Sequence, residues 1–200
     1  MVIYKGPSMI DGAPIVAIIS GLDSKTRNTK TGNMPQVWIF RADIHPINAM
    51  REGLDYSICG NCPHRPQLLG KDALTAYSRS CYVMPMPINS AYKKYGAGLM
   101  PYMAPYKVAK LLKGKKVRLG AYGDPAAVPL RVWKTLCKYC ESTGYTHQWR
   151  TCDAGFAEYL QASCDNFMDV VQSTAKGYRT FFVQNVATLD GVVREYQGIK

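Results

Sequence analysis

The sequence has no long apolar run. Its most apolar stretch, residues 15–19, is far shorter than the roughly 18 apolar residues that a membrane-spanning helix needs. Residues 1–12 lack the apolar core and the cleavage site of a secretory signal. Low-complexity tracts and internal repeats are also absent from the sequence. We therefore expect a folded cytoplasmic protein that has no membrane anchor.

Acidic residues are few compared with basic ones. The chain has 25 lysines and arginines against 14 aspartates and glutamates, which gives a net charge of +11. This excess favours anionic partners, either a small anionic molecule or nucleic acid. A solvated basic surface that only keeps the protein soluble explains the charge equally well, so charge alone does not choose among these readings.

A disulfide framework is not expected either, because the seven cysteines are odd in number and no secretory signal precedes them. Metal binding, catalysis and burial remain. Cys59 and Cys62 form a C-x2-C pair in a predicted loop, Gly60 between them allows a tight turn, and Cys81 follows after residues 63–80. Soft thiolates at this spacing suit an iron–sulfur cluster, such as [4Fe-4S], or zinc. We predict that these three cysteines bind a metal centre.

Two further residues are candidates for completing this centre. Cys164 ends a predicted strand, where sites commonly form, and is a candidate fourth ligand. The alternative is an ordinary core cysteine. His64 lies two residues after Cys62 and is a candidate either to support the ligands by hydrogen bonding or to replace one of them.

A second C-x2-C pair, Cys137 and Cys140, has a different context. It falls on the same face of a predicted helix as Leu130 and Trp133, at helical spacings. Free cysteine behaves as a small buried hydrophobe, so we interpret this pair as part of the core. A zinc site that combines both pairs stays open as the alternative, because a metal can bind across one helical turn.

Hydrophobic patterning predicts one α/β domain over residues 1–200, with an irregular cysteine- and proline-rich segment at about 59–105. Strand–helix–strand alternation in the C-terminal half implies parallel strands covered by helices. This indicates a small or incomplete (β/α) barrel-like fold, or an open parallel sheet. We predict strands at 15–20, 36–40, 117–122, 145–149, 160–164 and 179–183. We predict helices at 105–112, 129–141 and 166–177, and a short helix within 45–58 that ends near Gly53.

The working site of either architecture lies at the carboxyl ends of the strands. Gly123, Asp124 and Asp165 follow predicted strands, and His147 lies within the strand predicted at 145–149. We expect these four residues to line a pocket at that edge. Plainer roles compete with this expectation. Asp124 is well placed to cap the turn that follows it, and a lone histidine such as His147 is often a satisfied core residue.

Five segments of the sequence form a recognisable set: 59–65 (CGNCPHR), 81–83 (CYV), 117–129 (VRLGAYGDPAAVP), 143–150 (TGYTHQWR) and 177–181 (GYRTF). Together they resemble an uncharacterised family of small bacteriophage-encoded proteins with three cysteines. The resemblance implies a phage origin, and with it the host cytoplasm, and the three-cysteine motif, but no known activity. Many members of that family have further cysteines after the last strand, whereas this chain has none after Cys164, so any fourth ligand differs here or the site has only three protein ligands. A looser similarity of architecture is to radical SAM enzymes, in which three cysteines hold a [4Fe-4S] cluster whose open iron binds S-adenosylmethionine. Their compact C-x3-C-x2-C loop is absent here.

Three functions fit these observations. The first is an iron–sulfur protein with redox or radical-type chemistry. The second is a zinc-stabilised, basic nucleic-acid-binding protein without catalysis. The third is an accessory protein that acts through protein contacts and needs no metal.

Overall fold

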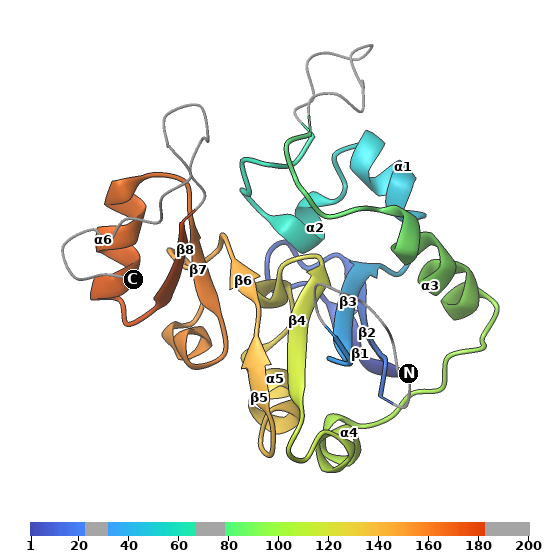
Figure 1. Cartoon of the computed structure of the whole chain (residues 1–200). Helices are drawn as coiled ribbons and strands as arrows, with labels where there is room; N and C mark the ends of the chain where they lie inside the picture. Colours follow the sequence, from blue (N-terminus) through green and yellow to red (C-terminus); the bar gives the residue numbers. More distant parts are fainter. Residues whose placement is uncertain (23–31, 67–78, 183–200) are drawn as a thin grey trace.

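The computed structural model describes residues 1–22, 32–66 and 79–182, and it contains two β-sheets (Figure 1). The larger sheet has the strand order β1-β2-β3-β4-β5, and the smaller sheet has the order β6-β7-β8. The strands are β1 (Val2–Pro7), β2 (Pro14–Ser20), β3 (Gln36–Arg41), β4 (Lys116–Tyr122), β5 (Glu141–Thr143), β6 (Tyr145–Thr146), β7 (Gln161–Cys164) and β8 (Arg179–Phe182).

Strand direction determines where the site forms. β1, β2 and β3 pair antiparallel, whereas β3–β4, β4–β5, β6–β7 and β7–β8 pair parallel. Only Gly144 separates β5 from β6, and its carbonyl oxygen accepts a hydrogen bond from the backbone N–H of Gln161. β3, β4, β6, β7 and β8 therefore all end at one edge, which faces α2 in Figure 1.

These pairings confirm an α/β fold with parallel strands in the C-terminal half. A closed barrel is not formed by the described residues, because β8 pairs only with β7, and the outer side of β1 has only an isolated bridge from Val2 to Tyr102. The strands predicted at 15–20 and 36–40 are confirmed as β2 and β3, which pair antiparallel as a hairpin. Most of the loop that connects them (residues 23–31) lies outside the described residues.

The helices are short and cover the sheets from outside. α4 packs against α5 and β1, and α6 packs against β7 and β8. Asn166 caps α6 by accepting a hydrogen bond from the backbone N–H of Asp169, as helix-capping chemistry predicts. The α-helices are α1 (Pro46–Arg51), α2 (Tyr56–Cys59), α3 (Met86–Gly96), α4 (Pro105–Leu111), α5 (Leu130–Leu136) and α6 (Phe167–Ala175).

The irregular segment predicted at 59–105 is partly wrong, because it contains the eleven-residue helix α3. Pro87 lies in the first turn of α3, where a missing N–H costs nothing. Tyr92 and Tyr95 of this helix pack edge-on against Phe40 of β3, at ring-centroid distances of 5.9 and 5.7 Å. Tertiary packing of this kind leaves only a weak local signal in the sequence.

Other elements also differ from the prediction. β1, β5 and α2 were not expected, and α5 ends at Leu136 rather than near residue 141. The strand expected at 145–149 is only Tyr145–Thr146, because the chain turns away at His147 to follow the carboxyl edge. That turn places His147 at the end of a strand rather than within one.

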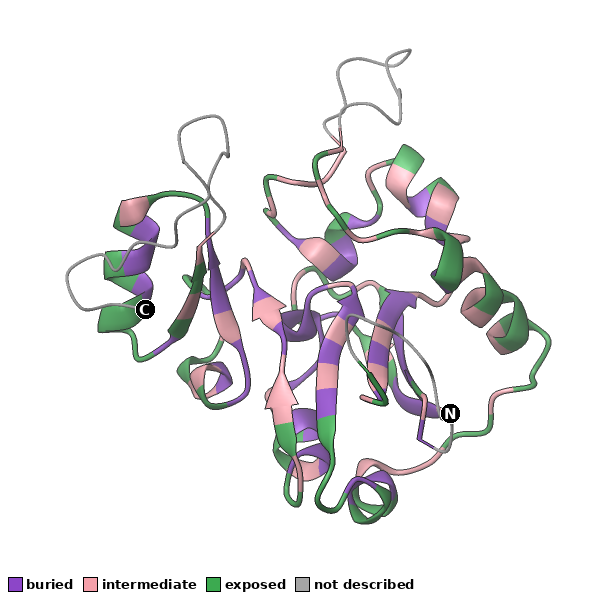
Figure 2. Cartoon of the chain, in the orientation of Figure 1, coloured by how far each residue is buried: buried purple, intermediate pink, exposed green. Residues whose placement is uncertain are grey.

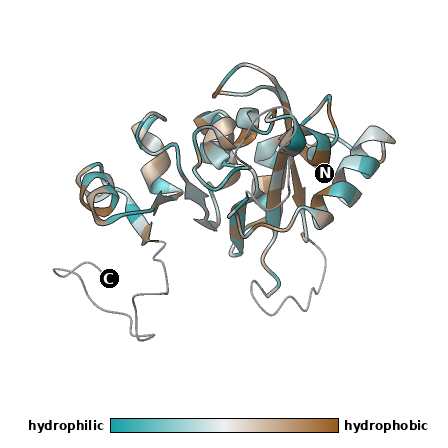
Figure 3. Ribbon diagram, turned by 90° about the horizontal axis from the view of Figure 1, so that it is seen from above, coloured by the Kyte–Doolittle hydropathy of each residue, from teal (hydrophilic) through white to brown (hydrophobic). Residues whose placement is uncertain are grey.

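Buried residues concentrate on the strands of the larger sheet, while the helices expose one side (Figure 2). Residues 15–19 of β2 are all buried, which fits a strand covered on both faces. Seen from above, hydrophobic segments gather along these strands, and more hydrophilic segments lie on the outer helices (Figure 3). No helix in the described ranges is long and apolar enough to cross a bilayer.

Candidate metal centre

A cavity of about 110 Å³ lies at the carboxyl edge of the parallel strands. It gathers residues from α2, from the loop after it, and from the ends of β4 and β6. The predicted site residues that line it are Cys59, Cys62, Cys81, Gly123, Asp124 and His147, and His64 lines it as well. The structure therefore brings all three cysteines of the predicted motif to one cavity, although Cys81 is distant from the pair in sequence.

Gly60 sets the path of the chain between the two cysteines of the C-x2-C pair. Cys59 is the last residue of α2, and Gly60 follows with φ 55° and ψ −137°, a region open essentially to glycine alone. A Cβ atom here would collide with the side-chain amide of Gln148. That amide donates a 2.9 Å hydrogen bond to the carbonyl oxygen of Cys59, so glycine permits both the turn and its attachment to the β6 end.

An ion pair beneath the cysteine loop holds its shape. Arg65 donates two hydrogen bonds to Oδ1 of Asp55, at 2.6 and 3.1 Å, and one each to the carbonyl oxygens of Gly53 and Gly60, at 2.8 and 3.0 Å. Burial raises the pKa of Asp55, and the hydrogen bonds from Arg65 oppose that rise. The guanidinium therefore compensates a buried carboxylate and joins both ends of the loop.

The thiols of Cys59 and Cys62 are protonated at neutral pH when no metal is bound. Burial raises the pKa of Cys59 well above its usual value, and the negative charge of Asp55 adds to the rise. Burial also raises the pKa of Cys62 to about 12. A bound cation reverses this balance, because it stabilises the thiolates and releases their protons. All seven cysteines lie in the described part of the chain and are free.

Asp124 joins three elements at the cavity. Its Oδ1 accepts a 2.9 Å hydrogen bond from the backbone N–H of Ala126, and its Oδ2 accepts bonds from Thr146 Oγ1 at 3.0 Å and the N–H of His147 at 2.9 Å. Burial raises its pKa to about 6, and these bonds oppose the rise. The expected capping role is confirmed, and the same carboxyl group also fixes the backbone at His147.

Gly123 precedes Asp124 with φ 77°, and its Cα approaches β3 closely. A Cβ atom there would lie 2.8 Å from the carbonyl oxygen of Ile39. The glycine is therefore required for packing of the loop against β3, which in turn sets where Asp124 lies.

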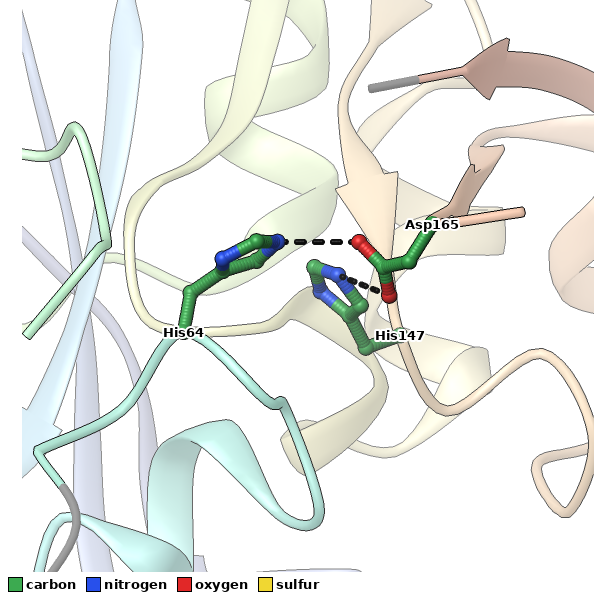
Figure 4. Close-up of side chains that lie close together, drawn as sticks. All are labelled: His64, His147 and Asp165. Carbon is green, nitrogen blue, oxygen red and sulfur yellow. Dashed lines mark hydrogen bonds and ion pairs between the residues drawn. The ribbon is translucent and has the colours of Figure 1, made fainter. Parts of the chain in front are cut away.

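A second group of donors forms part of the same wall. His64, His147 and Asp165 each offer one ligand atom, and these three atoms lie within 4.8 Å of one another. Figure 4 shows both imidazole rings directed at the two oxygens of the Asp165 carboxylate. Among the described residues, this is the one group of three histidine, cysteine or acidic side chains with such close ligand atoms.

The structure does not bring the other sequence-predicted residues to the cavity surface. Asp165 contacts the cavity only through the two histidines. Cys164 is fully buried, with its sulfur 3.3 Å from Ser173 Oγ, and it does not line the cavity. Cys137 belongs to the hydrophobic core, as interpreted, and Cys140 packs against that core. Cys140 directly precedes β5, so this pair lies at the amino edge, opposite the cavity.

Sequence reasoning missed several lining residues. Asp55, Arg65, Arg79 and Tyr122 all line the cavity. Two of them, Asp55 and Arg65, flank the cysteine pair in sequence. Opposite charges on either side of a ligand loop are the signal that could have found them.

No protein-family model, curated protein or solved structure matches this chain. The bacteriophage origin that the resemblance implies therefore stays a prediction.

Proposed function

We propose that the chain binds an iron–sulfur cluster through Cys59, Cys62 and Cys81. One observation carries this proposal: the three thiols of the motif line a single cavity at the carboxyl edge of the parallel strands. Buried neutral thiols at such an edge are suited to a soft metal centre that displaces their protons.

A tetrahedral zinc ion with bonds of about 2.3 Å holds its thiolate sulfurs about 3.8 Å apart, whereas in a [4Fe-4S] cluster each cysteine binds a different iron. The three thiols of the cavity are soft ligands suited to either centre, and metal analysis separates the two.

Such a cluster supplies one-electron redox chemistry. With three protein thiolates, one iron is left to bind a substrate or a cofactor such as S-adenosylmethionine. We also propose that the strands around the cavity form an incomplete barrel-like arrangement. The chain itself contributes a protected cavity whose wall is fixed by Asp124 and contains His147. The charge of +11 supports an anionic substrate. Seven free cysteines are typical of a protein in a reducing compartment, and we propose that this chain acts in the host cytoplasm.

The first test is anaerobic purification, followed by an absorption spectrum and analysis of iron, sulfide and zinc. We expect a brown protein with about four iron and four sulfide per chain. A colourless protein with about one zinc would instead support the zinc-stabilised, nucleic-acid-binding alternative. Steep loss of DNA or RNA affinity with added salt would then be the next result to seek.

A matched pair of variants tests the ligand set. Cys62→Ser removes a proposed ligand, so the cluster should be lost. Cys152→Ser is the control, because Cys152 lies outside the cavity and its sulfur, 3.3 Å from the Tyr178 hydroxyl, is replaced by another hydrogen-bonding group. A cluster that survives in full in Cys62→Ser would refute the proposed ligands.

A further inference from the structure

We propose a second metal site, in which His64, His147 and Asp165 hold one divalent transition-metal ion in the wall of the cavity. None of these ligands is a cysteine, so the site goes beyond the proposed cluster and stands or falls separately from it.

The three side chains come from separate parts of the fold. His64 lies in the loop after α2, His147 directly follows β6, and Asp165 directly follows β7. His64 Nε2 is 2.9 Å from Asp165 Oδ1, and His147 Nε2 is 3.6 Å from Asp165 Oδ2 (Figure 4). Two imidazoles and one carboxylate thus converge from three backbone segments.

One donor atom of this group is buried without a hydrogen bond. His147 Nε2 is inaccessible to solvent and has no hydrogen-bond partner in the described structure, since the 3.6 Å to Asp165 is too long for one. A buried polar nitrogen left in this way costs free energy. Coordination to an ion placed between His147, His64 and Asp165 would satisfy it.

The surroundings hold both rings in place. The backbone N–H of His147 donates to Asp124, which fixes the base of that side chain. His64 Nδ1 is 2.8 Å from Ser80 Oγ, and the serine hydroxyl can accept a hydrogen bond from the N–H at this position when Nε2 binds a metal. Histidine ligands in metal sites commonly have such a partner on their second nitrogen.

The donor set indicates the class of ion. Two histidines and one carboxylate are the ligands of catalytic zinc and of non-haem Fe²⁺ sites, in which the remaining positions accept water or substrate. Mg²⁺ and Ca²⁺ prefer oxygen ligands and are disfavoured by two imidazoles. His64 and His147 both line the cavity, so an open position on the ion would face the space that the cysteines also line.

A plain ion pair among these residues is the competing explanation, and metal titration of the full chain separates the two. The starting protein carries Cys59→Ser, Cys62→Ser and Cys81→Ser, which removes the thiolates. We expect this protein to bind about one Co²⁺, without a sulfur-to-cobalt charge-transfer band. Adding His147→Gln or Asp165→Asn should weaken Co²⁺ binding at least about 100-fold, because even residues that only support ligands cost about 10–100-fold when replaced.

His45→Asn is the matched control in the same background. The chain has three histidines, and His45 caps α1 through its ring nitrogen, a role that asparagine can take over. This variant should bind Co²⁺ unchanged. A cooperatively folded serine variant that binds no Co²⁺, or binding that His147→Gln leaves intact, would overturn the proposal.

If the serine variant does not fold, the same cobalt titration is made on the chain with its wild-type cysteines. The wild-type chain should then bind one cobalt equivalent that lacks the charge-transfer band, in addition to any thiolate-bound metal, and His147→Gln should remove only that equivalent. Iron and sulfide analysis that finds no cluster in a chain that retains this cobalt equivalent would refute the cluster alone.

Discussion

Replacing Arg65 with methionine should destabilise the protein strongly at neutral pH. Methionine keeps an unbranched, flexible side chain but removes four hydrogen bonds, two to Asp55 and one each to the carbonyl oxygens of Gly53 and Gly60. The Asp55 side chain is 4 % exposed and that of Arg65 is 17 % exposed, so solvent cannot replace the lost partner. The variant therefore leaves a buried carboxylate uncompensated.

Removing one partner of a buried ion pair costs about 3–5 kcal/mol. For a chain of this length, that corresponds to a fall in melting temperature of about 6–20 °C. The size of the effect should depend on pH. Burial already raises the folded-state pKa of Asp55, and loss of Arg65 removes the main influence that lowers it. The folded variant therefore takes up a proton more readily than the unfolded chain, and its deficit shrinks as pH falls and Asp55 becomes neutral.

Urea denaturation of Arg65→Met and wild type, at about pH 7 and at about pH 4.5, measures both effects. Asp55→Asn combined with Arg65→Met should recover part of the loss, because it removes the stranded charge. A loss below about 1 kcal/mol at neutral pH, typical of an exposed pair, would refute the reasoning. So would a deficit that grows as pH falls.

Gly60→Ala should destabilise the fold by at least about 1–3 kcal/mol and lower the iron content, because its backbone conformation excludes a side chain and the new Cβ collides with a neighbouring amide; thermal melts and iron analysis measure this. Asp124→Ala should cost about 2–4 kcal/mol, because it leaves the backbone N–H of His147 and that of the capped turn without acceptors. Burial raises the folded-state pKa of Asp124 from 3.8 to about 6, so the contribution of this carboxyl group to stability falls as pH rises between these two values. Urea titrations at several pH values in this range should show this pH dependence of the unfolding free energy in the wild type and its absence in the variant. Cys137→Ala should lose about 1 kcal/mol and keep its full iron content, since this cysteine is part of the core; loss of iron would contradict its assignment.

Local patterns were sufficient for much of the fold. The run of apolar residues at 15–19, the Asn166 cap and the proline at the start of α4 each act over a few residues, and all three lie in elements that the structure confirms. α3 was missed because it is held by contacts of Tyr92 and Tyr95 with a distant strand. Such packing has no counterpart in the local sequence.

The cysteine motif was determined by the sequence alone, because the spacing of Cys59 and Cys62 around a glycine is a property of one short loop. The cavity was decided by the tertiary structure. Parallel strands end at a common edge, and this edge brings His147 and Asp165 close to His64. The spacing of the three residues along the sequence does not indicate that they meet. Only the folded chain could unite these donors, because strand direction and pairing, rather than separation along the chain, set which side chains meet.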